Sequence, residues 1–237
     1  MKQVKTKFLI PVTLLGGGIG AALMKILYAT GVDHKGLLVR SHPAFAGIWI
    51  LTALMAAALL LGCRKPGNTP GWAHSFSRSP VSGLCCLPLG AAFALSGFRG
   101  IFSAGQGLDV AVMALSLLSV PCLVYVAVCR FRGTTPHYLA FGVLCVFFGI
   151  RLVAHYRLWS SDPQLMDYVF YLLAQVCLML ASYRLAHCAA GGDSRKLSFP
   201  VLMGCFLSLM CLPSCPEPLF MGSCALWLLG CLPREEE

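Results

Sequence analysis

Charged residues are scarce in this chain, making up 11% of 237 residues, whereas about a quarter of a soluble domain is charged. Hydrophobic residues make up 58% and lie in long runs separated by short polar segments. A run of about 18 or more apolar residues crosses a bilayer core about 30 Å thick as one helix. Because such runs fill most of the chain, the sequence predicts one all-α, polytopic transmembrane bundle over residues 1–237.

The chain also lacks the motifs of common catalytic and cofactor sites. It has no P-loop, no H-E-x-x-H and no C-x-x-C. Most of its thirteen cysteines lie inside apolar runs, where a thiol packs as a small hydrophobe. No paired carboxylates stand at catalytic spacing, so the sequence leans away from an enzyme and predicts no catalytic residue, metal or cofactor. Pairing of Cys211 with Cys215, which flank a proline-rich turn, stays open.

The formal net charge of +9 invites a comparison with nucleic-acid-binding proteins, whose basic patches contact phosphates. Here the basic residues lie in short tethers between apolar runs, where positive charge fixes membrane topology. The sequence therefore predicts the lipid bilayer as a partner and excludes nucleic acid.

The apolar runs predict about eight helices, with seven as the alternative. The last 35 residues before the C-terminal tail are too long for one crossing, at about 52 Å as a helix, and C-L-P-S-C-P-E-P interrupts them. Two short crossing helices, or a re-entrant pair of half-helices, fit this segment. The predicted helices cover residues 8–30, 43–63, 83–102, 108–129, 137–159, 162–189, 198–212 and 218–232.

The basic residues also predict the orientation of the bundle. In the eight-helix arrangement, twelve basic residues lie on the side of the termini and six on the other side. We therefore expect both termini in the cytoplasm and the chain in the cell membrane. The twelve are Lys2, Lys5, Lys7, Arg64, Lys65, Arg78, Arg130, Arg132, Arg184, Arg195, Lys196 and Arg234.

Polar residues concentrate around the corner between the fifth and sixth predicted helices. Arg151 lies eight residues before Trp159, so it sits about 12 Å below the corner. A charge at such depth is costly unless it is paired or reaches water, and it marks a functional site by default. Arg151 and His155 are four residues apart and share one helix face.

The returning helix carries a matching polar face. Asp167, Tyr171 and Gln175 follow each other at four-residue steps. Because the two helices are adjacent and antiparallel, we expect the two polar faces to meet, with Arg151 paired to Asp167. Asp109 is the next acidic partner that we consider for Arg151.

The corner itself also carries a resemblance. W-S-S-D-P-Q-L-M-D-Y, followed by an apolar helix and a terminal hairpin, resembles an uncharacterised family of small bacterial multi-pass membrane proteins. The likeness covers mainly residues 148–232. It implies a bacterial inner membrane and brings no activity or catalytic residue with it.

These observations lead to two hypotheses of function. In the first, a pocket near the outer face binds or transports a small polar solute, such as a zwitterion, or relays a proton through His155, because an imidazole titrates near neutral pH. In the second, the chain is an accessory protein that contacts a partner membrane protein, and its polar residues only lock helices together. The candidate substrate-binding residues are Arg99, Arg151, His155, Asp167, Tyr171 and Gln175.

Overall fold

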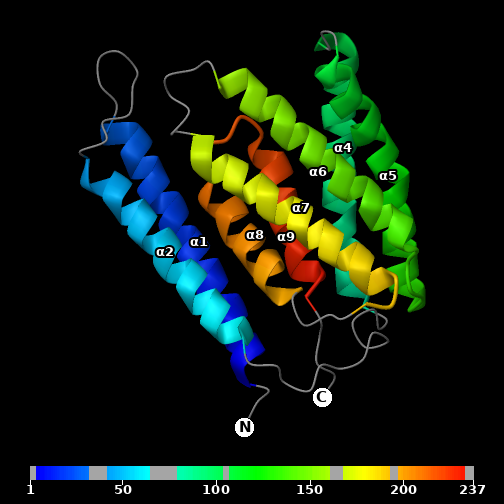
Figure 1. Cartoon of the computed structure of the whole chain (residues 1–237), viewed down its shortest axis with the longest axis horizontal. Coiled ribbons are helices and arrows are strands. Elements are labelled where there is room, and N and C mark those ends of the chain that lie inside the picture. Colours follow the sequence, from blue (N-terminus) through cyan, green and yellow to red (C-terminus); the bar gives the residue numbers. More distant parts are fainter. Residues whose placement is uncertain are drawn as a thin grey trace.

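The computed structural model describes residues 4–31, 42–64, 79–103, 107–160, 168–192 and 197–232, and all statements of structure concern these ranges. They contain eight α-helices and no strand, which confirms the all-α class (Figure 1). The helices are α1 (Val4–Thr30), α2 (Pro43–Arg64), α4 (Pro80–Ser103), α5 (Leu108–Arg132), α6 (Tyr138–Trp159), α7 (Val169–Ala189), α8 (Ser198–Met210) and α9 (Pro218–Gly230).

Six of these helices are long and apolar enough to cross a membrane: α1, α2, α4, α5, α6 and α7. The helices α8 and α9 are apolar but have 13 residues each, or about 20 Å, which is short of a bilayer core about 30 Å thick. The chain is thus a multi-pass membrane protein with six candidate spans and two shorter helices. The eight predicted helices are present, but the last two are too short to cross alone.

The short helices form a hairpin in the middle of the molecule. α8 packs against α1, α2 and α7, whereas α9 packs against α4 and α8. Figure 1 shows the hairpin between the α1–α2 pair and the other long helices. The side chains of α8 are apolar for the most part, and nearly all of them are buried. The hairpin is therefore a core element of the bundle.

Three glycines of α1 pack against this hairpin and against α2: Gly16, Gly17 and Gly20. A Cβ atom on Gly16 would lie 2.9 Å from Met55 Sδ, and one on Gly20 would lie 2.8 Å from Met210 Cγ. Between them, Gly17 lies against Leu209 of α8. Because glycine has no side chain, α1 approaches α2 and α8 closely on this face, as small residues allow between membrane helices.

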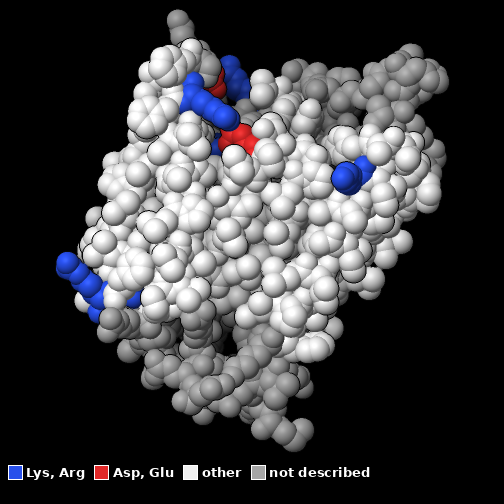
Figure 2. Space-filling model, turned by 180° about the vertical axis from the view of Figure 1, so that it is seen from behind, with Lys and Arg blue, Asp and Glu red and all other residues white. Residues whose placement is uncertain are grey.

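The ends of the helices divide into two sets. The start of α1 and the end of α9 lie at the same end of the bundle, and the ends of α4 and α6 lie at the opposite end (Figure 1). Between the two ends the visible surface is largely free of charge. Acidic and basic side chains lie together near the end where α4 and α6 finish, and basic side chains also lie toward the opposite end (Figure 2). A belt of exposed apolar side chains is what lipid contact requires.

Candidate functional site

A cavity of about 640 Å³ lies near the end of the bundle where α4 and α6 finish, between α4, α5, α6 and the start of α9. Its volume falls in the range of about 300–1,000 Å³ that is typical of small-molecule sites. Its polar lining residues are Ser96, Arg99, Asp109, Arg151, His155 and Glu217. The cavity therefore collects several charged groups inside an otherwise apolar bundle.

The polar faces of α6 and α7 meet beside this cavity. The Arg151 Nη2 atom donates to the Tyr171 hydroxyl at 3.2 Å, and the Gln175 amide lies 3.2 Å from His155 Nδ1. These two contacts show that Arg151 and His155 of α6 face Tyr171 and Gln175 of α7. Arg151 and His155 line the cavity. Tyr171 and Gln175 contact them but do not belong to the cavity lining.

The acidic partner of Arg151 is Glu217, which precedes α9. Glu217 Oε2 lies 2.7 Å from Arg151 Nη2. The predicted partner, Asp167, lies outside the described residues, and Asp109 lines the same cavity. Sequence reasoning missed this pair because residues 66 positions apart give no periodic signal. The available clue was that Glu217 is the acidic residue of the turn C-L-P-S-C-P-E-P.

The local sequence explains why Glu217 is available to Arg151. The turn between α8 and α9 closes with the backbone N–H groups of Ser214 and Cys215 donating to the Cys211 carbonyl oxygen. Pro218 opens α9. Proline suits this position because a backbone N–H there would have no partner inside the helix. The Glu217 side chain makes no capping hydrogen bond to α9, so its carboxylate is directed to Arg151 instead.

A cluster of phenylalanines packs against the ion pair between Arg151 and Glu217. Phe93 of α4 packs against Phe147 and Phe220 with ring centroids 4.5 and 5.3 Å apart. The Arg151 guanidinium carbon lies 4.0 Å from the centroid of the Phe220 ring, which is cation–π distance. Phe220 lines the cavity, and the rings of Phe93 and Phe147 pack behind it.

The His155 ring sits in a second aromatic group. It stacks on Trp159 with centroids 4.9 Å apart and an angle of 6°, and Tyr171 contacts it edge-on at 5.2 Å. Trp159 in turn stacks on Tyr168 at 4.0 Å. Trp159 is buried among these rings.

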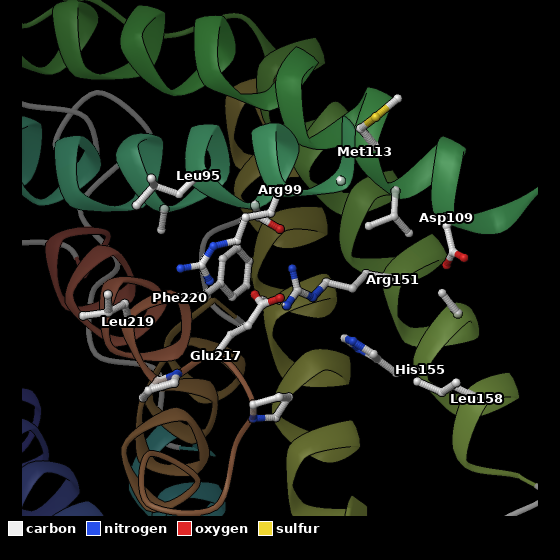
Figure 3. A pocket seen from close by; sticks show the side chains of 17 residues that line it. Leu95, Arg99, Asp109, Met113, Arg151, His155, Leu158, Glu217, Leu219 and Phe220 are labelled. Atoms are coloured by element: carbon white, nitrogen blue, oxygen red, sulfur yellow. Dashed lines mark hydrogen bonds and ion pairs between the residues drawn. The ribbon is translucent and has the colours of Figure 1, made fainter. Parts of the chain in front are cut away.

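Two buried polar atoms at this site have no partner within the described residues: Arg151 Nε and Gln175 Oε1. Buried polar groups are nearly always hydrogen-bonded in folded proteins. Arg151 lines the cavity, but its Nε atom is itself buried. In Figure 3, Arg99 of α4 and Arg151 of α6 reach toward Glu217 from different helices.

Cys211 and Cys215, whose pairing the sequence left open, are separate thiols. Among the described residues, no three His, Cys, Asp or Glu side chains lie close enough together to hold a metal ion.

Comparisons with protein family models, with curated proteins and with solved structures found no match to this chain. The resemblance of the corner motif to a bacterial family is therefore not supported by a family model. The class that the fold defines is a multi-pass helical membrane protein.

Proposed function

We propose that the chain binds or transports a small polar solute in the cavity lined by Arg99, Asp109, Arg151, His155 and Glu217. The observation that carries this proposal is the cavity itself, because it places four charged side chains beside about 640 Å³ of space within an apolar bundle. Charges inside a membrane protein are costly and usually serve a solute or ion. A proton is the alternative cargo, and His155, which lines the cavity, is the group that would carry it.

The arrangement of α8 and α9 supports this proposal. Short apolar helices of 13 residues, joined by a proline-rich turn, fit a re-entrant hairpin better than two crossings. Discontinuous helices of this kind often carry the solute sites of transporters at their broken ends. Here the turn supplies Glu217, one of the charged residues of the cavity.

We also propose that the cavity opens to the outer side of the cell membrane, with both termini in the cytoplasm. The twelve basic residues on the side of the termini, against six on the other, support this orientation. A bacterial inner membrane is proposed from the resemblance of the corner motif alone.

A second candidate function is that of an accessory membrane protein without cargo. Arg151 binds both Glu217 and Tyr171, and these two contacts join the α8–α9 hairpin to α6 and α7. Polar contacts between membrane helices commonly serve only to hold them together. In this case, the cavity would have no solute and Arg151 would matter for folding only.

A solute panel separates the two candidates. We suggest measuring the thermal unfolding midpoint of the purified chain with amino acids, amines, carboxylates, sugars and polyols. A solute that binds the native state raises the midpoint. A cavity ligand should stabilise the wild type and Arg157→Met, which changes an exposed arginine of α6 outside the cavity lining. It should not stabilise Ser96→Phe, which fills the cavity. A panel without any cavity-dependent solute would refute binding and favour the accessory role.

A further inference from the structure

The turn between α5 and α6 gathers side chains that donate hydrogen bonds. The Tyr125 hydroxyl accepts the backbone N–H of His137 at 3.3 Å, so its own hydrogen remains available to another acceptor. The Nδ1 atom of His137 accepts the backbone N–H of Leu139 at 3.3 Å, which leaves Nε2 as the donor of the ring. Arg132 lies about two helical turns beyond Tyr125 on the same side of α5, and its exposed side chain adds further N–H groups. The turn therefore presents donors of three kinds to a ligand.

Within the described ranges, no acidic residue lies at this end of the bundle. Asp109 and Glu217, the two acidic residues of these ranges, both line the cavity, which lies near the opposite end. Basic side chains are visible toward the end where α5 finishes (Figure 2). Positive charge alone satisfies the topology of a membrane protein. The hydroxyl and the imidazole that accompany Arg132 at this turn are not needed for topology, and they match an anion that accepts several hydrogen bonds.

An apolar, exposed surface of α5 leads toward this turn. Val124, Val128 and Phe131 are exposed, and helical spacing places them on the same side of α5 as Arg132. Because α5 is long and apolar enough to cross a membrane, such a surface fits the acyl chains of lipids. A lipid lying along this surface has its headgroup at the turn.

The length of α5 places this turn at the level of the headgroups. The helix has 25 residues, or about 38 Å, whereas a hydrocarbon core is about 30 Å thick. Tyr125 and Tyr138 are each 45% exposed, and the centroids of the Tyr138 and His137 rings lie 4.4 Å apart. Exposed tyrosines are enriched where a membrane protein meets the headgroups. Arg132, in the last turn of α5, thus lies at the depth of the lipid phosphates.

We propose that this turn binds the headgroup of an anionic phospholipid, with an acyl chain along the exposed surface of α5. The phosphate oxygens accept hydrogen bonds from Arg132, Tyr125 and His137, because a phosphodiester has acceptors and no donor. A phospholipid with a net negative charge, such as phosphatidylglycerol, neutralises Arg132. The ammonium group of a zwitterionic phospholipid finds no carboxylate among the described residues at this end. The site is separate from the cavity and does not depend on a solute there.

Native mass spectrometry of the folded, detergent-purified chain tests this site, because it resolves the binding of single lipid molecules. Phosphatidylglycerol and phosphatidylcholine with the same acyl chains serve as probes. The first phosphatidylglycerol should bind the wild type about fivefold tighter, which is the contribution of one basic residue beside an anionic lipid. Arg132→Gln should remove this difference. Tyr125→Phe keeps the ring and loses the hydroxyl, so it should weaken both lipids about tenfold, because both carry the phosphate.

Arg157→Gln is the matched control, because it removes an exposed arginine near the opposite end of the bundle and should leave the difference between the lipids intact. Equal effects of Arg132→Gln and Arg157→Gln, or equal affinity of the wild type for both lipids, would overturn the site. An unchanged affinity of Tyr125→Phe would do the same. Glycerol 3-phosphate carries the phosphate without acyl chains and should not displace phosphatidylglycerol. If it does, the occupant is a soluble phosphate ester and the lipid assignment fails.

Discussion

The ion pair between Arg151 and Glu217 predicts unequal costs for removing its two members. The Arg151 side chain is 3% exposed, whereas the Glu217 side chain is 35% exposed and lines the cavity. Glu217→Gln leaves a buried cation without a countercharge, and such a loss costs about 3–5 kcal/mol in soluble proteins. Because the neutral amide still accepts a hydrogen bond from Arg151, we expect the free energy of unfolding to fall by about 2–3 kcal/mol.

The reverse substitution should cost less. Arg151→Met keeps an unbranched apolar side chain against Phe220 and leaves behind a carboxylate that reaches the cavity. It removes the two hydrogen bonds that Nη2 donates to Tyr171 and Glu217, each worth about 0.5–1.5 kcal/mol net. Their sum is about 1–3 kcal/mol, and removal of a buried charge offsets part of it, so we expect a loss of about 1–2 kcal/mol. The double variant should lose about 2 kcal/mol less than the sum of the single losses, because the buried charge is gone.

The assay is unfolding by sodium dodecyl sulfate in mixed micelles, followed by tryptophan fluorescence. Arg157→Met serves as the control and should stay within about 0.5 kcal/mol of the wild type, because it changes an exposed side chain. Strict additivity of the single losses would show that Arg151 and Glu217 do not interact. A greater loss for Arg151→Met than for Glu217→Gln would contradict the burial difference on which the reasoning depends.

Further predictions concern packing, topology and thiol exposure. Gly17→Ala should lower the free energy of unfolding by about 1–3 kcal/mol, because its Cβ would lie 2.9 Å from Leu209 Cβ. Gly18→Ala, with no atom within 4 Å of the new Cβ, should be neutral or stabilising by up to about 1 kcal/mol, and equal effects in the same unfolding assay would contradict the α1–α8 contact. Reporter tags on both termini should indicate the cytoplasm, and a tag on the outer side at either end would refute the proposed topology. N-ethylmaleimide should modify the half-buried Cys215 faster than Cys211, which is fully buried, as read by mass spectrometry; equal rates would contradict the packing of the hairpin turn.

The long helices were predictable from the sequence because the length of an apolar run directly reflects the thickness of a bilayer. The predicted end of the fifth helix at residue 159 agrees with Trp159, where α6 ends. The last two helices were located correctly, yet composition could not tell a short crossing from a buried hairpin. Only the packing of α8 against α1 and α7 shows that this segment lies in the core.

The candidate site was predictable where it depends on helical spacing and not where it depends on tertiary contacts. Steps of four residues placed Arg151 and His155 on one face, and Tyr171 and Gln175 on the facing one. The contribution of Glu217 arises because the α8–α9 turn enters the bundle beside α6. Nothing in the spacing of a sequence encodes that placement.

The most direct test of an outward-facing polar cavity is its reaction with a membrane-impermeant thiol reagent. Ser96→Cys places a thiol on the cavity lining of α4, and Val153→Cys places one on an exposed apolar position of α6 outside that lining. A thiol reacts as its thiolate, which needs contact with water. With the wild-type chain as background, Ser96→Cys should be modified from outside in intact cells, and Val153→Cys should not. An unreactive Ser96→Cys, or one modified only in inverted vesicles, would contradict a solute cavity that opens to the outer side.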